Sequence, residues 1–336
     1  MSIRRLPSLY LVLSFACLAI FIVSLALGRY SVPPWTVCRI IVGRILPLPQ
    51  DWPAAAAIVV LRVRLPRVVA AAAIGAALAA AGAAYQGLFR NPLVSPDVLG
   101  VSAGSGFGAA LGIFAGLGSL LVAAASFVGG VLCVLLVGLF AWGQRGERSL
   151  ALVLSGIVAG SLFSSGTSFL KLIADPQNVL PAITYWLMGS LSGIKTADVL
   201  VAAPLLAAAL ILLWLLGWQL NLLTLGEDEA RTLGSNVTLA RAVVIAAATL
   251  ATAVCVAVSG LIGWVGLIVP HLARKLAGSD YRRLLPAAML IGAAFLMVVD
   301  DVARLLSTAE IPLGILTSFI GAPFFLYLMR RERSLA

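Results

Sequence analysis

The sequence predicts an all-α polytopic membrane protein with about ten transmembrane helices per subunit. Of its 336 residues, 62% are hydrophobic and 11% are charged, and the mean hydropathy is +1.09. Soluble globular domains have about a quarter of their residues charged, so the composition excludes that class. The hydrophobic residues gather in runs that, at about 1.5 Å per helical residue, are long enough to cross a hydrocarbon core of about 30 Å. We therefore treat residues 1–336 as a single transmembrane domain.

The net charge of +10 indicates membrane orientation and not nucleic-acid binding. Most lysine and arginine residues lie in short turns between apolar runs, where basic residues keep a loop on the cytoplasmic side. With ten spans and a cytoplasmic N-terminus, fourteen of the 23 basic residues face the cytoplasm. These are Arg4, Arg5, Arg90, Arg145, Arg148, Arg231, Arg241, Arg274, Lys275, Arg282, Arg283, Arg330, Arg331 and Arg333. Both termini are expected on that side.

The first span is predicted over Met1–Gly28, which carries Arg4 and Arg5 near its start. Its apolar run is too long for the core of a typical signal peptide, and it lacks a small-residue cleavage site. The segment from Arg29 to Val60 contains five prolines, so a structured outer loop is expected there.

Nine further apolar runs are predicted as spans, which makes ten in all. They are Val68–Leu88, Val98–Gly116, Leu120–Trp142, Leu150–Leu172, Val199–Trp218, Leu239–Ser259, Leu261–Leu276, Leu285–Leu305 and Leu313–Met329. Between the fifth and sixth spans, residues 175–195 contain a short apolar helix with Tyr185, Trp186 and Met188. Such an aromatic helix suits a membrane surface or the rim of a cavity.

Glycine recurs at every fourth position along the third span. The positions are Gly100, Gly104, Gly108, Gly112 and Gly116. This spacing puts glycines on one ridge of a helix, where the backbone of another helix can approach closely. The pattern G-x-G-x-x-A also begins at Gly104, but no strand precedes it and it lies in an apolar helix. The glycines therefore predict membrane packing and not dinucleotide binding.

The other nine basic residues lie outside the membrane or at its outer boundary in this topology. They include Arg62, Arg64, Arg67 and Arg304, an outward cluster that opposes the positive-inside tendency. One explanation is local: Asp300 precedes Arg304 by four residues, a helical spacing that favours an ion pair. Another is a specific partner outside the membrane. Asp301 has no assigned role.

The longest cytoplasmic loop, residues 221–234, is also the most acidic. Glu227, Asp228 and Glu229 suit the start of a short helix, Arg231 lies later in it, and Gly234 can end it in the left-handed conformation. A solvated connector would account for this composition. A charged helix on the inner face is better explained as a docking element for a soluble partner.

No enzymatic or metal-binding motif is found. His271 is the only histidine, which excludes an HExxH zinc site, and no lysine follows a glycine, which excludes a Walker A loop. The four cysteines lack metal-type spacing. Ionisable residues are nearly absent from the centres of the spans, which argues against a proton- or sodium-coupled carrier. We expect no cofactor, and any ATP must be bound by another chain.

Seven motifs cover nearly the whole chain. They are RLPR (Arg64–Arg67), QGLFRNPL (Gln86–Leu93), PDVLGVSAGSG (Pro96–Gly106), LGEDEARTLG (Leu225–Gly234), GLIGWVGLIVPHLAR (Gly260–Arg274), DDVARL (Asp300–Leu305) and EIPLGILTSFIGAPFF (Glu310–Phe325). Together they resemble the permease subunit of type II ABC importers, the family that takes up iron-siderophores, haem and cobalamin. Each motif alone is weak, and their combination is specific.

The resemblance implies a bacterial inner-membrane importer that moves a bulky metal chelate from periplasm to cytoplasm. In that family, two permease copies form a central pathway, with spans two to five and seven to ten related as an inverted repeat. Two cytoplasmic ATPase subunits and a periplasmic substrate-binding protein are the implied partners. Family frequency favours an iron-siderophore as substrate, with haem and cobalamin left open.

The resemblance also implies roles for individual residues. Docking of the binding protein is assigned to Arg64, Arg67 and Arg304, and ATPase coupling to Glu227, Asp228, Glu229, Ala230, Arg231, Leu233 and Gly234. The cytoplasmic gate is assigned to Asn91, Leu93 and Ser149; the family has two hydroxyl residues at the last site, whereas Leu150 takes the second place here. Pathway lining is expected from Ser161, Ser164, Ser165, Thr167 and Ser168.

Two other classes of protein remain as alternatives. An ion-coupled secondary transporter would work without ATPase subunits, and an integral membrane enzyme would need a polar catalytic cluster.

Overall fold

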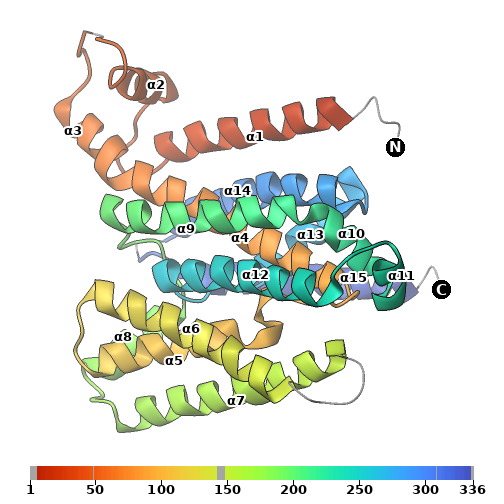
Figure 1. The fold of residues 1–336 in the computed structure, drawn as a ribbon. Helices are drawn as coiled ribbons and strands as arrows, with labels where there is room; N and C mark the ends of the chain where they lie inside the picture. Colours follow the sequence, from red (N-terminus) through yellow and green to blue (C-terminus); the bar gives the residue numbers. More distant parts are fainter. Residues whose placement is uncertain (1–5, 48, 142–147, 308, 334–336) are drawn as a thin grey trace.

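The computed structural model describes residues 6–47, 49–141, 148–307 and 309–333, and these residues form helices joined by short connections (Figure 1). The helices are α1 (Leu6–Ala26), α2 (Pro34–Val42), α3 (Ala54–Ile58), a π-helical turn (Val59–Arg64), α4 (Leu65–Leu88), a 3-10 turn (Pro96–Leu99), α5 (Val101–Phe114), α6 (Ser119–Ala141), α7 (Arg148–Ile173), α8 (Val179–Leu187), α9 (Thr196–Leu215), α10 (Gly217–Leu225), α11 (Glu227–Thr232), α12 (Val237–Ser259), α13 (Val265–Ala277), α14 (Tyr281–Leu305) and α15 (Leu313–Arg333).

Each of the ten predicted spans corresponds to one helix: α1, α4, α5, α6, α7, α9, α12, α13, α14 and α15. Among the described residues, seven helices are long and apolar enough to cross a membrane, and α5 and α15 are shorter apolar helices. The short aromatic helix predicted after the fifth span is α8. Asp175 accepts hydrogen bonds from the backbone and side chain of Asn178 just before α8, and these bonds hold the pKa of the Asp175 carboxyl below its usual range.

The prediction of an outer loop from Arg29 to Val60 is wrong in part. That segment contains α2, and its last residues begin a continuous helix of 35 residues, Ala54–Leu88, so the second span starts well before Val68. The π-helical turn ends at Arg64, two residues before Pro66, which has no backbone N–H to donate. A widened turn of this kind accommodates the missing bond without ending the helix.

The eighth span is also shorter than predicted, because α13 starts at Val265 and not at Leu261. Gly260 and Trp264 have φ angles of 69° and 70°, which an α-helix cannot accommodate. Trp264 is held there by packing against Gly321 and by an edge contact with Phe325 of α15. The connection between α12 and α13, residues 260–264, is therefore a defined break in the helical structure.

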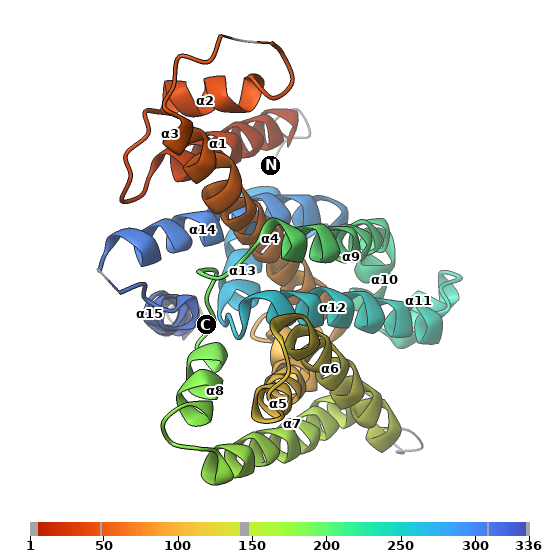
Figure 2. The ribbon, with the colours of Figure 1, turned by 90° about the vertical axis from the view of Figure 1, so that its left-hand side faces the viewer.

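α4 runs through the middle of the molecule, surrounded by α9, α12, α13 and α14 (Figure 2). Close backbone contacts explain how four helices fit around it. A Cβ atom at Gly75 would lie 2.2 Å from the carbonyl oxygen of Gly292 on α14, and one at Gly82 would lie 1.9 Å from that of Gly266 on α13. Glycine at these positions lets the helices pack at a distance that any larger residue would prevent.

The glycine ridge of α5 packs against α6, as predicted for most of its length. A Cβ atom at Gly104 would lie 2.4 Å from the carbonyl oxygen of Gly129, and one at Gly108 would lie 2.1 Å from that of Ala125. Gly116 is the exception, because a Cβ there would meet nothing within 4 Å. The packing surface therefore ends at Gly112.

Leucine at Gly104 or Gly108 should lower the thermal stability of the purified protein, since it would force α5 and α6 apart. Overpacking of this kind costs about 1–3 kcal/mol, and contact with backbone atoms leaves little room for relaxation. Thermal unfolding in detergent measures the effect. Gly138→Leu is the matched control, because Gly138 is an exposed helical glycine of α6 with no neighbour within 4 Å. Equal melting profiles for the α5 variants and this control would contradict the packing role.

The two ends of the bundle carry different groups. α1 begins and α15 ends at the end that carries α10 and α11, on the right in Figure 1. We call this the α11 end. The opposite end carries α2, α3 and the C-termini of α1 and α14. Arg4, Arg5 and Arg145, on which the orientation prediction partly depends, lie outside the described residues.

Candidate functional site

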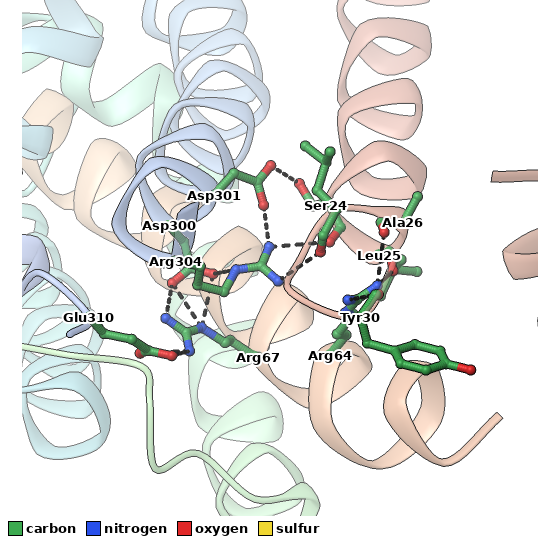
Figure 3. A network of polar contacts seen from close by, with 11 residues as sticks. Ser24, Leu25, Ala26, Tyr30, Arg64, Arg67, Asp300, Asp301, Arg304 and Glu310 are labelled. Carbon is green, nitrogen blue, oxygen red and sulfur yellow. Dashed lines mark hydrogen bonds and ion pairs between the residues drawn. The ribbon is translucent and has the colours of Figure 1, made fainter. Parts of the chain in front are cut away.

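Three of the arginines predicted to face outward meet at the end opposite α11, where the C-termini of α1 and α14 pack against the start of α4 (Figure 3). Arg64, Arg67 and Arg304 are only 4%, 7% and 9% exposed. Two aspartates, a glutamate and several backbone carbonyls surround them. We call this set of side chains the arginine network.

Arg67 joins α14 to the connection between α14 and α15. Its Nε atom donates to both carboxylate oxygens of Asp300 at 3.0 Å, and its Nη2 atom donates to Oδ1 of Asp300 at 2.9 Å. Its Nη1 atom donates to both oxygens of Glu310 at 2.9 Å. The planar guanidinium group thus binds two carboxylates at once, a geometry that lysine could not reproduce.

Arg304 connects α14 to the end of α1. Its Nε atom lies 3.2 Å from Asp300, so the predicted ion pair between these residues is present. Its Nη2 atom donates to Asp301 and to the carbonyl of Ser24. Asp301 in turn accepts a 2.6 Å hydrogen bond from the Ser24 hydroxyl, which gives this aspartate a structural role.

Arg64 caps the C-terminus of α1. Its Nη1 atom donates to the carbonyls of Leu25 and Ala26 at 2.9 Å, and its Nη2 atom donates to the carbonyl of Tyr30. Helix C-terminal carbonyls lack intrahelical partners and carry partial negative charge, so a buried cation is stabilised there. A Cβ at Gly28 would lie 2.3 Å from Arg64, so this turn has no room for a larger residue.

The arginine network is balanced in charge, with three arginines and the three carboxylates of Asp300, Asp301 and Glu310. The fold does gather the arginines that the resemblance assigns to docking. None of the three, however, presents a free guanidinium group, because each bonds to groups of this chain. Glu310 is the most exposed charged member, at 31% of its side chain. Sequence reasoning assigned no role to Glu310 or Ser24, which are distant from Arg67 along the chain.

At the α11 end, the predicted short helix is present as α11, and its residues divide between two faces. Asp228, Glu229 and Arg231 are exposed on one face. Ala230 is fully buried on the other. Gly234 has φ of 81°, and the Gly234 and Ser235 amides donate to the carbonyls of Arg231 and Ala230, which ends the helix in the expected left-handed turn.

Glu227 fastens α11 to α12. One carboxylate oxygen bonds to Nη2 of Arg241 on α12, and the other lies 3.4 Å from Arg231. Arg241 is only 8% exposed, and its Nε and Nη1 atoms have no hydrogen-bond partner in the described residues. The buried charge of Arg241 therefore depends on Glu227. Exposed Leu233 and Gly234 follow α11 at the surface.

The predicted gate residues lie on separate elements. Asn91 and Leu93 are exposed in the turn after α4, where the Asn91 side chain accepts a 2.9 Å hydrogen bond from the Leu93 amide. Ser149 is half-buried in the first turn of α7, and Leu150 beside it is 55% exposed. The described residues show no bond between the two groups.

The predicted lining residues lie on α7, a helix with much of its surface exposed. In α7, Ser161, Ser164, Ser165 and Ser168 are exposed and Thr167 is half-buried. The hydroxyls of Thr167 and Ser168 donate to the carbonyls of Phe163 and Ser164 one turn earlier, each at 3.0 Å. These hydroxyls therefore need no external partner, yet they give an apolar helix a mildly polar surface.

Comparison with known proteins gives consistent matches over nearly the whole chain. The profile of the FecCD transport family matches residues 16–331. The molybdate import system permease protein MolB of Haemophilus influenzae is 42% identical over 305 residues, which cover 90% of each chain. A probable iron chelatin transport system permease of Helicobacter pylori is 38% identical over 324 residues, covering 96% of this chain and 98% of that protein. A solved structure described as an inward-facing conformation of a metal-chelate type ABC transporter superposes with a TM-score of 0.86 at 40% identity, covering 97% and 99% of the two chains.

Proposed function

This chain belongs to the FecCD transport family, and we propose that it is the permease subunit of an ATP-driven importer that carries a bulky metal chelate into the cytoplasm. The observation that carries the proposal is the structural match, because it spans almost all of both chains at 40% identity. At that identity and coverage, the two proteins share helix packing as well as helix number. The alternative, an ion-coupled secondary transporter, has no support among the relatives.

The pathway is proposed to form between two copies of this chain, with α7 facing it. In support, α7 combines exposed hydroxyl residues with low burial, 22% over its most apolar stretch. A helix surrounded only by lipid gains nothing from a row of serines. A surface of small hydroxyl groups without charge suits a large chelate that is carried whole.

An iron-siderophore complex is the substrate we propose, with haem and cobalamin as further candidates. The relatives are named for molybdate and for iron chelates, so the family alone does not select one substrate. The test is uptake into proteoliposomes that contain this chain, its ATPase and its binding protein. ATP-dependent uptake of a ferric siderophore in preference to haem, cobalamin and molybdate is the expected result. Uptake driven by an ion gradient without the ATPase would support a secondary transporter.

Two partner surfaces are proposed at opposite ends, which would put the α11 end in the cytoplasm of a bacterial inner membrane. A periplasmic binding protein would dock near the arginine network, with its carboxylates competing with Glu310 for Arg67. In support, Glu310 is the most exposed charged residue of the arginine network. Two ATPase subunits, one on each permease copy, would bind the exposed face of α11.

Alanine at Glu229 and Arg231 together should reduce ATP-coupled transport by tenfold or more while the protein still inserts and folds. Both side chains are exposed on α11, so their loss removes partner contacts without opening the core. Transport and co-purification of the ATPase subunit are measured side by side. Wild-type values for both would rule out docking at α11.

A further inference from the structure

A cavity of about 690 Å³ lies at the α11 end, where α9 ends, α10 begins and α14 begins. It is lined by Trp214, Leu215, Trp218, Asp280, Arg282 and Arg283. None of these residues belongs to the pathway, the gate or the arginine network. Two adjacent arginines and two tryptophans around one hollow are unusual in a chain with only 11% charged residues.

The cavity carries a net positive charge, because two guanidinium groups face one carboxylate, and that carboxylate is already hydrogen-bonded. Asp280 accepts hydrogen bonds from the side chain of Asn221 at 2.7 Å and from the backbone amide of Arg282 at 3.0 Å. Arg283 lies 3.6 Å from Asp280 and is 41% exposed, so this ion pair is loose. The exposed guanidinium group of Arg282 has no partner among the described residues. One free and one loosely held arginine are therefore available to an anion.

The aromatic residues indicate the depth of the cavity in the membrane. Trp214 and Trp218 are 53% and 55% exposed, and the Tyr10 hydroxyl on α1 donates to the backbone carbonyl of Arg283 at 2.9 Å. Tryptophan and tyrosine concentrate at the boundary between hydrocarbon and water, where lipid headgroups lie. The two arginines are thus held at headgroup level.

The surface leading away from the cavity is apolar. Along the side of α9 that continues from the cavity, Leu200, Ile211 and Leu215 are exposed by 69%, 56% and 60%. Acyl chains can lie against this face while the headgroup remains beside the arginines. A soluble anion would use the charged end and leave the face unused.

We propose that this cavity binds the phosphate headgroup of an anionic phospholipid, with the guanidinium groups of Arg282 and Arg283 on the phosphate and the acyl chains along α9. Arginine suits this role because its planar fork bonds two phosphate oxygens at once. Basic pockets between helices on the cytoplasmic side are known to favour anionic lipids. The site requires neither an ATPase nor a transported substrate.

The test uses the purified full chain in detergent, titrated with dioleoyl-phosphatidylglycerol or dioleoyl-phosphatidylcholine. Native mass spectrometry counts bound lipids, and thermal unfolding measures stabilisation. Wild-type protein should retain phosphatidylglycerol preferentially and melt at a higher temperature with it. The Arg282→Gln, Arg283→Gln double variant should weaken that preference about tenfold, the loss expected for one charge-assisted bond of about 1.5 kcal/mol.

A double variant with Lys275→Gln and Arg330→Gln is the matched control, because it removes two exposed charges at the same end that do not line the cavity. It should keep the preference. The proposal would be overturned if the Arg282, Arg283 double variant kept the preference for phosphatidylglycerol. It would also be overturned if the wild-type protein showed no such preference. Equal stabilisation by inorganic phosphate would also overturn it and indicate a small-anion site. If the double variant does not fold, Arg282→Gln alone gives the same comparison, since that side chain supports no contact in the described structure.

Discussion

Replacing Asp300 with alanine should destabilise the folded protein by about 3–5 kcal/mol, the range observed when one partner of a buried ion pair is removed. Asp300 is 1% exposed and accepts from Arg67 while lying 3.2 Å from Arg304. Its loss would leave two buried guanidinium groups short of a counter-charge. The measurement is the yield of folded protein and its thermal midpoint in detergent.

Two variants show whether burial decides the effect. Glu310→Gln should cost less, because this glutamate is 31% exposed and water can replace part of its bond to Arg67. Arg62→Gln is the control, since Arg62 is exposed on the same stretch of helix. If Asp300→Ala melts like this control, the network does not stabilise the fold. The arginines would then be retained chiefly for docking.

The Glu227→Gln substitution should reduce ATP-coupled transport by tenfold or more. The expected cause is weaker attachment of α11 to α12, whereas substitution of Glu229 removes a contact with the ATPase subunit. Glu227 points inward and neutralises Arg241, whose Nε and Nη1 atoms have no other partner in the described residues. Weakening a hydrogen bond between charged groups costs about 1.5–3 kcal/mol, and the exposure of Glu227, 32%, puts the loss at the low end. α11 would then move independently of α12.

Hydrogen exchange separates this effect from loss of a partner contact. In isolated Glu227→Gln protein, amides of residues 227–234 should exchange faster than in wild type, while the middle of α12 should not change. Asp228→Asn is the matched control, because Asp228 is exposed on the next position and has no bond in the described structure. Unchanged exchange in α11, with transport also unchanged, would show that Glu227 does not hold the helix.

The distribution of residues along the chain predicted the local elements of this protein. Apolar runs marked each of the ten spans, the acidic residues from Glu227 marked the start of α11, and the spacing of Gly104 and Gly108 marked the contact with α6. These features depend on hydrophobicity and helical periodicity, which are visible within one segment. The same reasoning misplaced the start of the second span, because the prolines before it suggested a loop.

The tertiary structure alone decided which charged groups meet. Asp300 and Arg304 are one helical turn apart, so their pairing was predictable, whereas Ser24, Arg67 and Glu310 come together only through the packing of α1, α4 and α14. Likewise, composition placed Glu227 on a charged helix but could not tell that it faces Arg241 and not the solvent. A helix of known sequence can present any face to its neighbours, and the rotation chosen depends on close contacts such as Gly75 against Gly292, between residues far apart in the chain.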